Sequence, residues 1–192
     1  PYWVYHEGMF FINADGTMGM EASNMSQKPF SPTLRKYMMS GAPLLINNNT
    51  IVEQTSSPVW PSANLQEHIR ESTASRSAIA IPTTNNHLLL IVAEGKVPGA
   101  VYCSPAPKGF GMTTPDIAKF IKYYFNAESA LNLDGGGSAS MCLKGYGDNG
   151  GVSGGLGVIS YPAWGSSPCP PAHTRYSNQR NFMQDAIAVI PN

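Results

Sequence analysis

The stretch Ala130-Leu131-Asn132-Leu133-Asp134-Gly135-Gly136-Gly137-Ser138 is the most informative part of this chain. Its first four residues indicate a buried strand, which runs directly into an aspartate and three glycines. Successive glycines let a ligand approach the main-chain amides, which can form an anion-binding nest. Asp134, at the end of a rigid element, could serve as an acid, a base or a sugar-hydroxyl acceptor, with the Ser138 hydroxyl beside it. The same residues also suit a tight turn whose aspartate merely caps backbone amides.

The segment before this stretch is predicted to be an amphipathic helix. Thr113 or Thr114 can cap the exposed amides, Pro115 suits the first helical position, and Asp116 complements the positive end of the helix dipole. Apolar residues then recur at helical spacing on one face: Ile117, Phe120, Ile121 and Tyr124. The helix is expected to end near Asn126.

The rest of the chain is predicted to be strands and loops. Apolar runs bounded by turn residues predict strands at 2–12, 44–46, 50–52, 76–81, 87–93 and 186–190. Turns at Asp15-Gly16, Asn47-Asn48-Asn49 and residues 83–86 join some of them, and the last two turns indicate hairpins. Residues 22–36, 53–75, 145–157 and 161–181 are expected to be loops. The fold class that follows is α+β: a mixed, largely antiparallel twisted sheet with few helices.

Composition limits the domain count and the partners. The chain has 192 residues, 42% of them hydrophobic, which favours a single domain over 1–192 with a real core. Charged residues are 12%, and 12 basic residues balance 12 acidic ones, so no electrostatic footprint for nucleic acid is present. No apolar run is long enough for a membrane span. The glycine- and proline-rich, charge-poor composition suits a secreted, lumenal or cell-surface protein.

The cysteines and sequons add little. Cys103, Cys142 and Cys169 are an odd number without metal-like spacing, so one disulfide with a free thiol and three buried thiols both remain open. The tripeptides Asn24-Met25-Ser26 and Asn48-Asn49-Thr50 are compatible with a secretory route, although such patterns are common by chance.

Two arginines are candidate ligand-binding residues. Arg76 lies in an apolar strand, where an unpaired charge would be costly, and a phosphate or Asp134 would be a suitable bidentate partner. An outward-facing arginine on an edge strand is the alternative. Arg180 invites the same argument but stands in a predicted loop.

Near the N-terminus, His6 and Glu7 precede the first turn and could form a second acid–base pair facing Asp134. The alternative is that both are solvated side chains at a chain terminus. Asp148-Asn149 offers oxygen ligands, but its spacing fits no standard calcium loop. No metal or cofactor is therefore assigned.

The glycine motif with its preceding helix resembles the hallmark of the phosphodiester glycosidase family. Further segments match in the right order: residues 8–19, the Ser40-Gly41-Ala42-Pro43-Leu44-Leu45 strand, the Ser75-Arg76-Ser77-Ala78-Ile79-Ala80 strand, and Arg180 with residues 185–189. The family usually has asparagine and a small residue where this chain has His6 and Glu7. It also has preceding strands and a helix that are expected to be missing here, whether they have been cleaved off, are supplied by another chain or an oligomer, or have been lost.

The resemblance implies hydrolysis of an α-linked, N-acetylglucosamine-like sugar-1-phosphodiester to free sugar and a phosphomonoester. Asp134 would then be the general acid/base or a sugar anchor, with Glu7 as the complementary carboxylate. Arg76 and the nest formed by Gly135, Gly136 and Gly137 would hold the phosphate. Further substrate contacts are expected from Asn132, Ser138, Gly41, Arg180 and His6. The alternative is a non-catalytic glycan-binding or assembly module that keeps the family fold.

Overall fold

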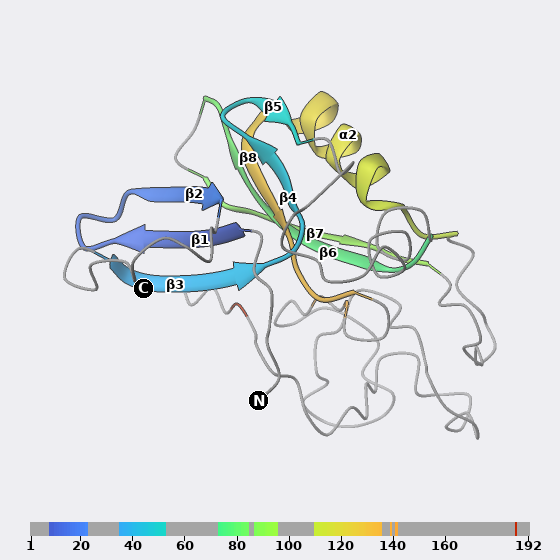
Figure 1. Cartoon of the computed structure of the whole chain (residues 1–192), viewed down its shortest axis with the longest axis horizontal. Helices are drawn as coiled ribbons and strands as arrows, with labels where there is room; N and C mark the ends of the chain where they lie inside the picture. The colour runs from blue at the N-terminus through green and yellow to red at the C-terminus, as the bar shows by residue number, and fades with distance from the viewer. Residues whose placement is uncertain are drawn as a thin grey trace, which may run out of the picture.

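The computed structural model describes residues 8–22, 35–52, 73–84, 87–95, 110–135, 139, 141 and 187 (Figure 1). Within these ranges the chain forms two antiparallel sheets and a helix, α2. The fold is α+β, as predicted. The strands of the smaller sheet have the order β2-β1-β3: β1 Gly8–Asn13, β2 Met18–Ala22 and β3 Arg35–Gly41. The larger sheet has the order β5-β4-β8-β6-β7: β4 Leu44–Asn47, β5 Thr50–Ile51, β6 Arg76–Pro82, β7 Leu89–Ala93 and β8 Ala127–Asn132.

The turn between β1 and β2 confirms the prediction at Asp15-Gly16. Gly16 adopts a φ of 86°, a conformation that glycine reaches without strain. Asp15 accepts hydrogen bonds at Oδ1 from the Thr17 hydroxyl (2.7 Å) and from the Thr17 amide (2.9 Å). These two bonds stabilise the ionised carboxylate, so they lower the pKa of Asp15.

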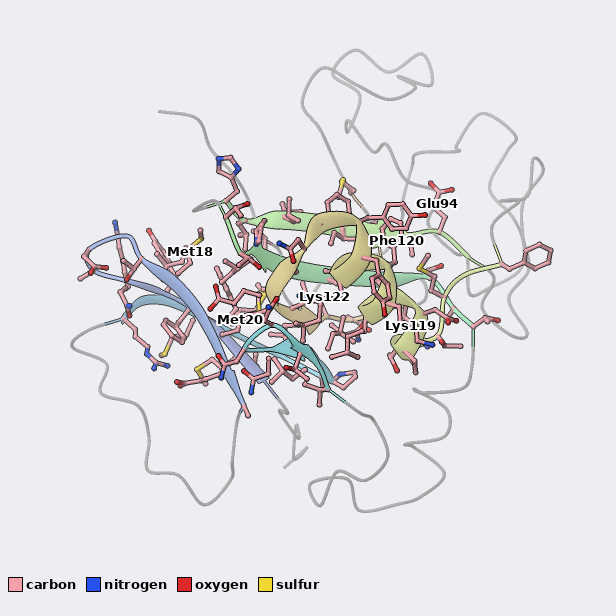
Figure 2. All side chains as sticks on the ribbon, turned by 90° about the horizontal axis from the view of Figure 1, so that it is seen from above. Met18, Met20, Glu94, Lys119, Phe120 and Lys122 are labelled. Carbon is pink, nitrogen blue, oxygen red and sulfur yellow. The ribbon has the colours of Figure 1, made fainter. Side chains whose placement is uncertain are left out.

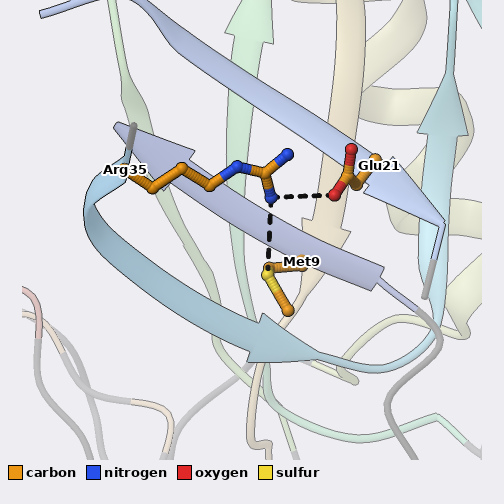
Figure 3. Close-up of polar contacts among 3 residues, drawn as sticks. All are labelled: Met9, Glu21 and Arg35. Atoms are coloured by element: carbon orange, nitrogen blue, oxygen red, sulfur yellow. Dashed lines mark hydrogen bonds and ion pairs between the residues drawn. The ribbon is translucent and has the colours of Figure 1, made fainter. Parts of the chain in front are cut away.

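The prediction of a loop over 22–36 is wrong at both ends, because Ala22 ends β2 and Arg35 and Lys36 begin β3, two strands that the sequence analysis did not predict. The charge of Arg35 is paired across the sheet. Arg35 Nη1 lies 2.8 Å from Glu21 Oε1 on β2 and 3.9 Å from Met9 Sδ on β1 (Figure 3). Its guanidinium carbon also lies 3.8 Å from the ring centroid of Phe11. Side chains from all three strands thus meet on this face of the smaller sheet.

The larger sheet confirms both predicted hairpins. The β4–β5 turn places Asn48 and Asn49 at φ values of 47° and 69°, which asparagine tolerates better than most residues. Strands β6 and β7 pair antiparallel, and β8 lies between β4 and β6. Strand β8 is interior to the larger sheet. The aspartate and glycines that follow it therefore begin at the end of a central strand.

Helix α2 (Thr114–Phe125) begins and ends as predicted. Thr113 accepts a hydrogen bond from the Asp116 amide as N-cap, and Asn126 ends the helix in the left-handed conformation. The predicted apolar face is wrong at Tyr124, which is 77% exposed and packs its ring against that of Phe120, 5.0 Å away between centroids. The side chains that face the sheet are Thr114, Ile117, Ala118 and Ile121.

The core has two clusters, one on each face of the larger sheet. Alanines of β6 and β8, among them Ala78, Ala80 and Ala130, lie on the face that α2 covers. Their small side chains allow the helix to approach the sheet closely. Ile79 and Leu131, the alternate residues of the same strands, pack on the opposite face with Phe10 of the smaller sheet. Figure 2 shows α2 above the larger sheet, with Met18 and Met20 of β2 to one side.

Several predicted elements lie outside the described residues. These are the strand portion 2–7, the bulk of the final strand 186–190, and the loops 145–157 and 161–181. Ile187 is described and packs against the cluster that contains Leu131. No helix in the described ranges is long and apolar enough to cross a membrane.

Candidate functional site

The candidate site is built on the C-terminal end of β8. Strand register pairs Ala78 of β6 with Asn132, and the next bond runs from the Leu133 amide to the Ser77 carbonyl at 2.8 Å. Continuing the antiparallel pairing brings Asp134 beside Arg76. Asp134 and Arg76, which are 58 positions apart in the sequence, therefore reach the same end of the sheet.

Asp134 is exposed at this strand end. Its Oδ1 accepts a hydrogen bond from the Gly135 amide at 2.8 Å, and its main-chain carbonyl accepts one from the Ser77 hydroxyl. The capping role considered for this aspartate is therefore real. It does not use up the carboxylate, because each carboxylate oxygen has two lone pairs and the residue remains open to solvent.

Asn132 is buried, with 4% of its surface exposed. Its Nδ2 donates to the carbonyl of Ala42 (2.8 Å) and to that of Leu133 (2.7 Å), which uses both amide protons. Its Oδ1 is buried and accepts from no donor among the described residues. Because an amide oxygen only accepts hydrogen bonds, a hydroxyl or a water would suit Asn132 Oδ1 as a partner, and the predicted substrate contact of Asn132 stays a prediction.

Arg76 is 7% exposed and lies on β6, an interior strand, so the alternative of an outward-facing arginine on an edge strand is wrong. Its Nε donates to the Met112 carbonyl at 3.0 Å, just before α2 begins. Burial lowers its pKa from the ordinary value, although an arginine stays protonated at neutral pH. The carboxylate of Asp134, considered as its partner, turns to the Gly135 amide.

Gly135 and Gly41 are positions of close backbone approach. A Cβ at Gly135 would lie 2.8 Å from the Ser75 carbonyl oxygen and 3.9 Å from Arg76 Nη1. The Gly135 backbone is thus directly beside the guanidinium. A Cβ at Gly41 would overlap the main-chain oxygen of Asn132. Close packing therefore explains why both positions are glycine. The ligand contacts predicted for these two glycines stay predictions.

Five of the predicted site residues come together at this strand end: Asp134, Arg76, Asn132, Gly135 and Gly41. The remaining ones lie outside the described residues: Glu7, His6, Gly136, Gly137, Ser138 and Arg180. The same holds for Cys103, Cys142 and Cys169. Sequence reasoning missed Ser77 as a site residue, although it directly follows Arg76 in a strand already singled out. No cluster of three or more potential metal-ligating side chains occurs within the described ranges.

Comparison with known proteins gives the family. The model of the phosphodiester glycosidase family matches residues 5–168, most of the chain, so this chain belongs to the phosphodiester glycosidases. No curated protein matches the sequence. The family resemblance noted on the glycine motif is thereby confirmed.

Two solved structures are similar to this chain. The catalytic domain of zebrafish N-acetylglucosamine-1-phosphodiester alpha-N-acetylglucosaminidase, auto-inhibited by its pro-peptide, superposes with a TM-score of 0.57 at 21% identity over 82% of this chain. A protein from Burkholderia pseudomallei K96243 gives a TM-score of 0.40 at 13% identity over 83% of this chain. The alignments span 45% and 36% of those two chains, respectively. The first match supports the fold.

Proposed function

We propose that this chain hydrolyses the sugar–phosphate C–O bond of an α-linked sugar-1-phosphodiester, releasing free sugar and a phosphomonoester. The observation that carries the proposal is the convergence of the exposed Asp134 carboxylate and the buried Arg76 guanidinium on the Gly135 backbone. A carboxylate beside a fixed cation suits a substrate in which a sugar carbon is bonded directly to a phosphate oxygen. The family membership supports the reaction class.

The roles follow from the charges. When the C1–O bond breaks, its electron pair leaves with the phosphate oxygen. Water adds a hydroxyl group to C1, and the remaining proton of that water must be accepted by another group. Arg76 would stabilise the charge that develops on the leaving phosphomonoester. Asp134 would transfer the proton as general acid/base or hold a sugar hydroxyl. The Asn132 oxygen, which can only accept, would suit a sugar hydroxyl, and Glu7 stays the candidate for the complementary carboxylate.

A non-catalytic glycan-binding module is the second candidate. The bond between the Gly135 amide and the Asp134 carboxylate favours it, since a turn cap needs no chemistry. Retention of the sheet end as a binding surface would explain the same residues. The two candidates differ in whether a sugar is released.

We also propose that the sugar resembles N-acetylglucosamine and that the protein is secreted, lumenal or on the cell surface. The low share of charged residues, 12%, supports the location, and the sequon at the β4–β5 turn is compatible with it. In that sequon Asn48, Asn49 and Thr50 are all exposed.

The test is incubation of the purified chain with a panel of UDP-sugars and with N-acetylglucosamine-1-phosphomethyl ester. We expect release of free sugar by the parent chain, detected by chromatography, and no release by the Asp134→Ala variant. Circular dichroism of both proteins checks that each is folded. If the folded parent releases no sugar from any of these substrates but binds them in calorimetry, the glycosidase proposal fails and the binding module replaces it.

A further inference from the structure

Ser77 contacts two consecutive residues of the candidate site. It lies on β6 directly after Arg76, and its carbonyl accepts the Leu133 amide at 2.8 Å. Its hydroxyl donates to the main-chain carbonyl of Asp134. Regular pairing between β6 and β8 reaches only to the Ala78–Asn132 pair, so these two bonds carry the pairing past the end of the strand.

The hydroxyl bond acts on a specific group, the peptide unit that joins Asp134 to Gly135. A peptide unit is planar, with its carbonyl and its amide pointing in opposite directions. The Ser77 hydroxyl holds the carbonyl end of this unit, and the Asp134 carboxylate accepts from its amide end at 2.8 Å. Rotation of the peptide plane would break both bonds. The orientation of the carboxylate therefore depends on a plane that Ser77 fixes.

The sequence around this unit explains why an external restraint is needed. Asp134 is followed by Gly135 and two more glycines, and glycine has more accessible backbone conformations than any other residue. Without a bond to its carbonyl, the Asp134–Gly135 peptide would sample several orientations. The carboxylate would then spend part of its time turned away from any bound substrate.

We propose that Ser77 is a positioning residue, which sets the direction of the Asp134 carboxylate by holding the Asp134–Gly135 peptide through its hydroxyl. The role of Ser77 in holding the peptide is independent of any activity. The consequence of that role for catalysis rests on the proposed glycosidase function. Ser77 does not itself touch substrate in this account.

The test compares Ser77→Ala with Ser77→Thr, which keeps the hydroxyl. The matched control is Thr83→Ala, because the Thr83 hydroxyl also donates to a main-chain carbonyl, that of Asn126, at 2.6 Å, just beyond the opposite end of β6. Hydrogen–deuterium exchange is followed in peptides that cover residues 128–135, and kcat and KM are measured on the substrate that the parent hydrolyses. Losing one such hydrogen bond corresponds to about a 10-fold effect.

We expect Ser77→Ala to accelerate exchange in the 128–135 peptides about 10-fold and to lower kcat about 10-fold with KM nearly unchanged. Ser77→Thr should restore both readouts, and Thr83→Ala should leave both at the parent level. Unchanged exchange in Ser77→Ala would overturn the structural part. Faster exchange with an unchanged kcat would overturn the catalytic part. A parent without turnover would sink the proposed function, while the exchange result would still decide whether Ser77 holds the peptide.

Discussion

Asp134→Asn is expected to lower kcat of sugar release by about 100- to 10,000-fold, the range that general acid–base groups contribute. Asparagine has nearly the same shape as aspartate and keeps an oxygen that can accept from the Gly135 amide. The bond from the Ser77 hydroxyl is made to the main-chain carbonyl of residue 134, so it survives the substitution. The change therefore removes the charge and the capacity to transfer a proton while it leaves the local structure in place.

The control for this variant is Asp15→Asn, in the turn between β1 and β2. Asp15 is an exposed aspartate whose Oδ1 also accepts a backbone amide, that of Thr17, at 2.9 Å. This substitution should leave kcat within about twofold of the parent, because it perturbs a surface turn alone. Comparable rates for Asp134→Asn and the parent would remove Asp134 from the catalytic role.

Arg76→Met is expected to lower kcat/KM by about 10- to 100-fold, because charge-assisted hydrogen bonds contribute about 1.5–3 kcal/mol each. Methionine keeps the apolar stem that lies in the sheet and removes the guanidinium beside Gly135. Arg76→Lys should recover only part of the loss, since a single ammonium cannot reproduce the planar fork that bonds the Met112 carbonyl and faces the glycine backbone.

A second readout separates phosphate binding from a purely structural role. If Arg76 holds the phosphate, inhibition by inorganic phosphate should weaken in Arg76→Met together with kcat/KM. Arg35→Met is the control, since Arg35 is also a partly buried arginine but pairs with Glu21 on the outer face of the smaller sheet. That variant should keep the inhibition constant of the parent. Unchanged inhibition in a folded Arg76→Met would assign Arg76 to the structure alone.

Local sequence signals predicted the larger sheet and the helix well, because those elements have short-range causes. Thr113 and Asn126 set the ends of α2 through capping, and the asparagines at 48 and 49 set the β4–β5 hairpin through their positive φ values. Strands β2 and β3 were not predicted, in part because Arg35 and Lys36 look like loop residues until Glu21 and Phe11 are known to lie across the sheet. Tyr124 was misassigned because helical spacing alone does not show where the buried stripe ends.

The candidate site was predictable to the level of residue types but not of partners. A charge in the apolar strand that begins at Arg76 and an aspartate before glycines pointed to residues that the structure brings to the same end of the larger sheet. The bond from Arg76 to the Met112 carbonyl and the two bonds from Asn132 depend on long-range pairing that spacing cannot show. Ser77 escaped notice because a serine on a strand is unremarkable until the carbonyl that it holds is identified.

In the proposed reaction, the bond between the sugar carbon and the phosphate oxygen is the one that breaks. Hydrolysis of N-acetylglucosamine-1-phosphomethyl ester in water enriched in ¹⁸O tests it directly, with mass spectrometry of the methyl phosphate product. We expect methyl phosphate without ¹⁸O, because water attacks the sugar carbon and the phosphate keeps all its original oxygens. Methyl phosphate that carries one ¹⁸O atom would show attack at phosphorus, and the chain would then be a phosphoesterase instead of a glycosidase.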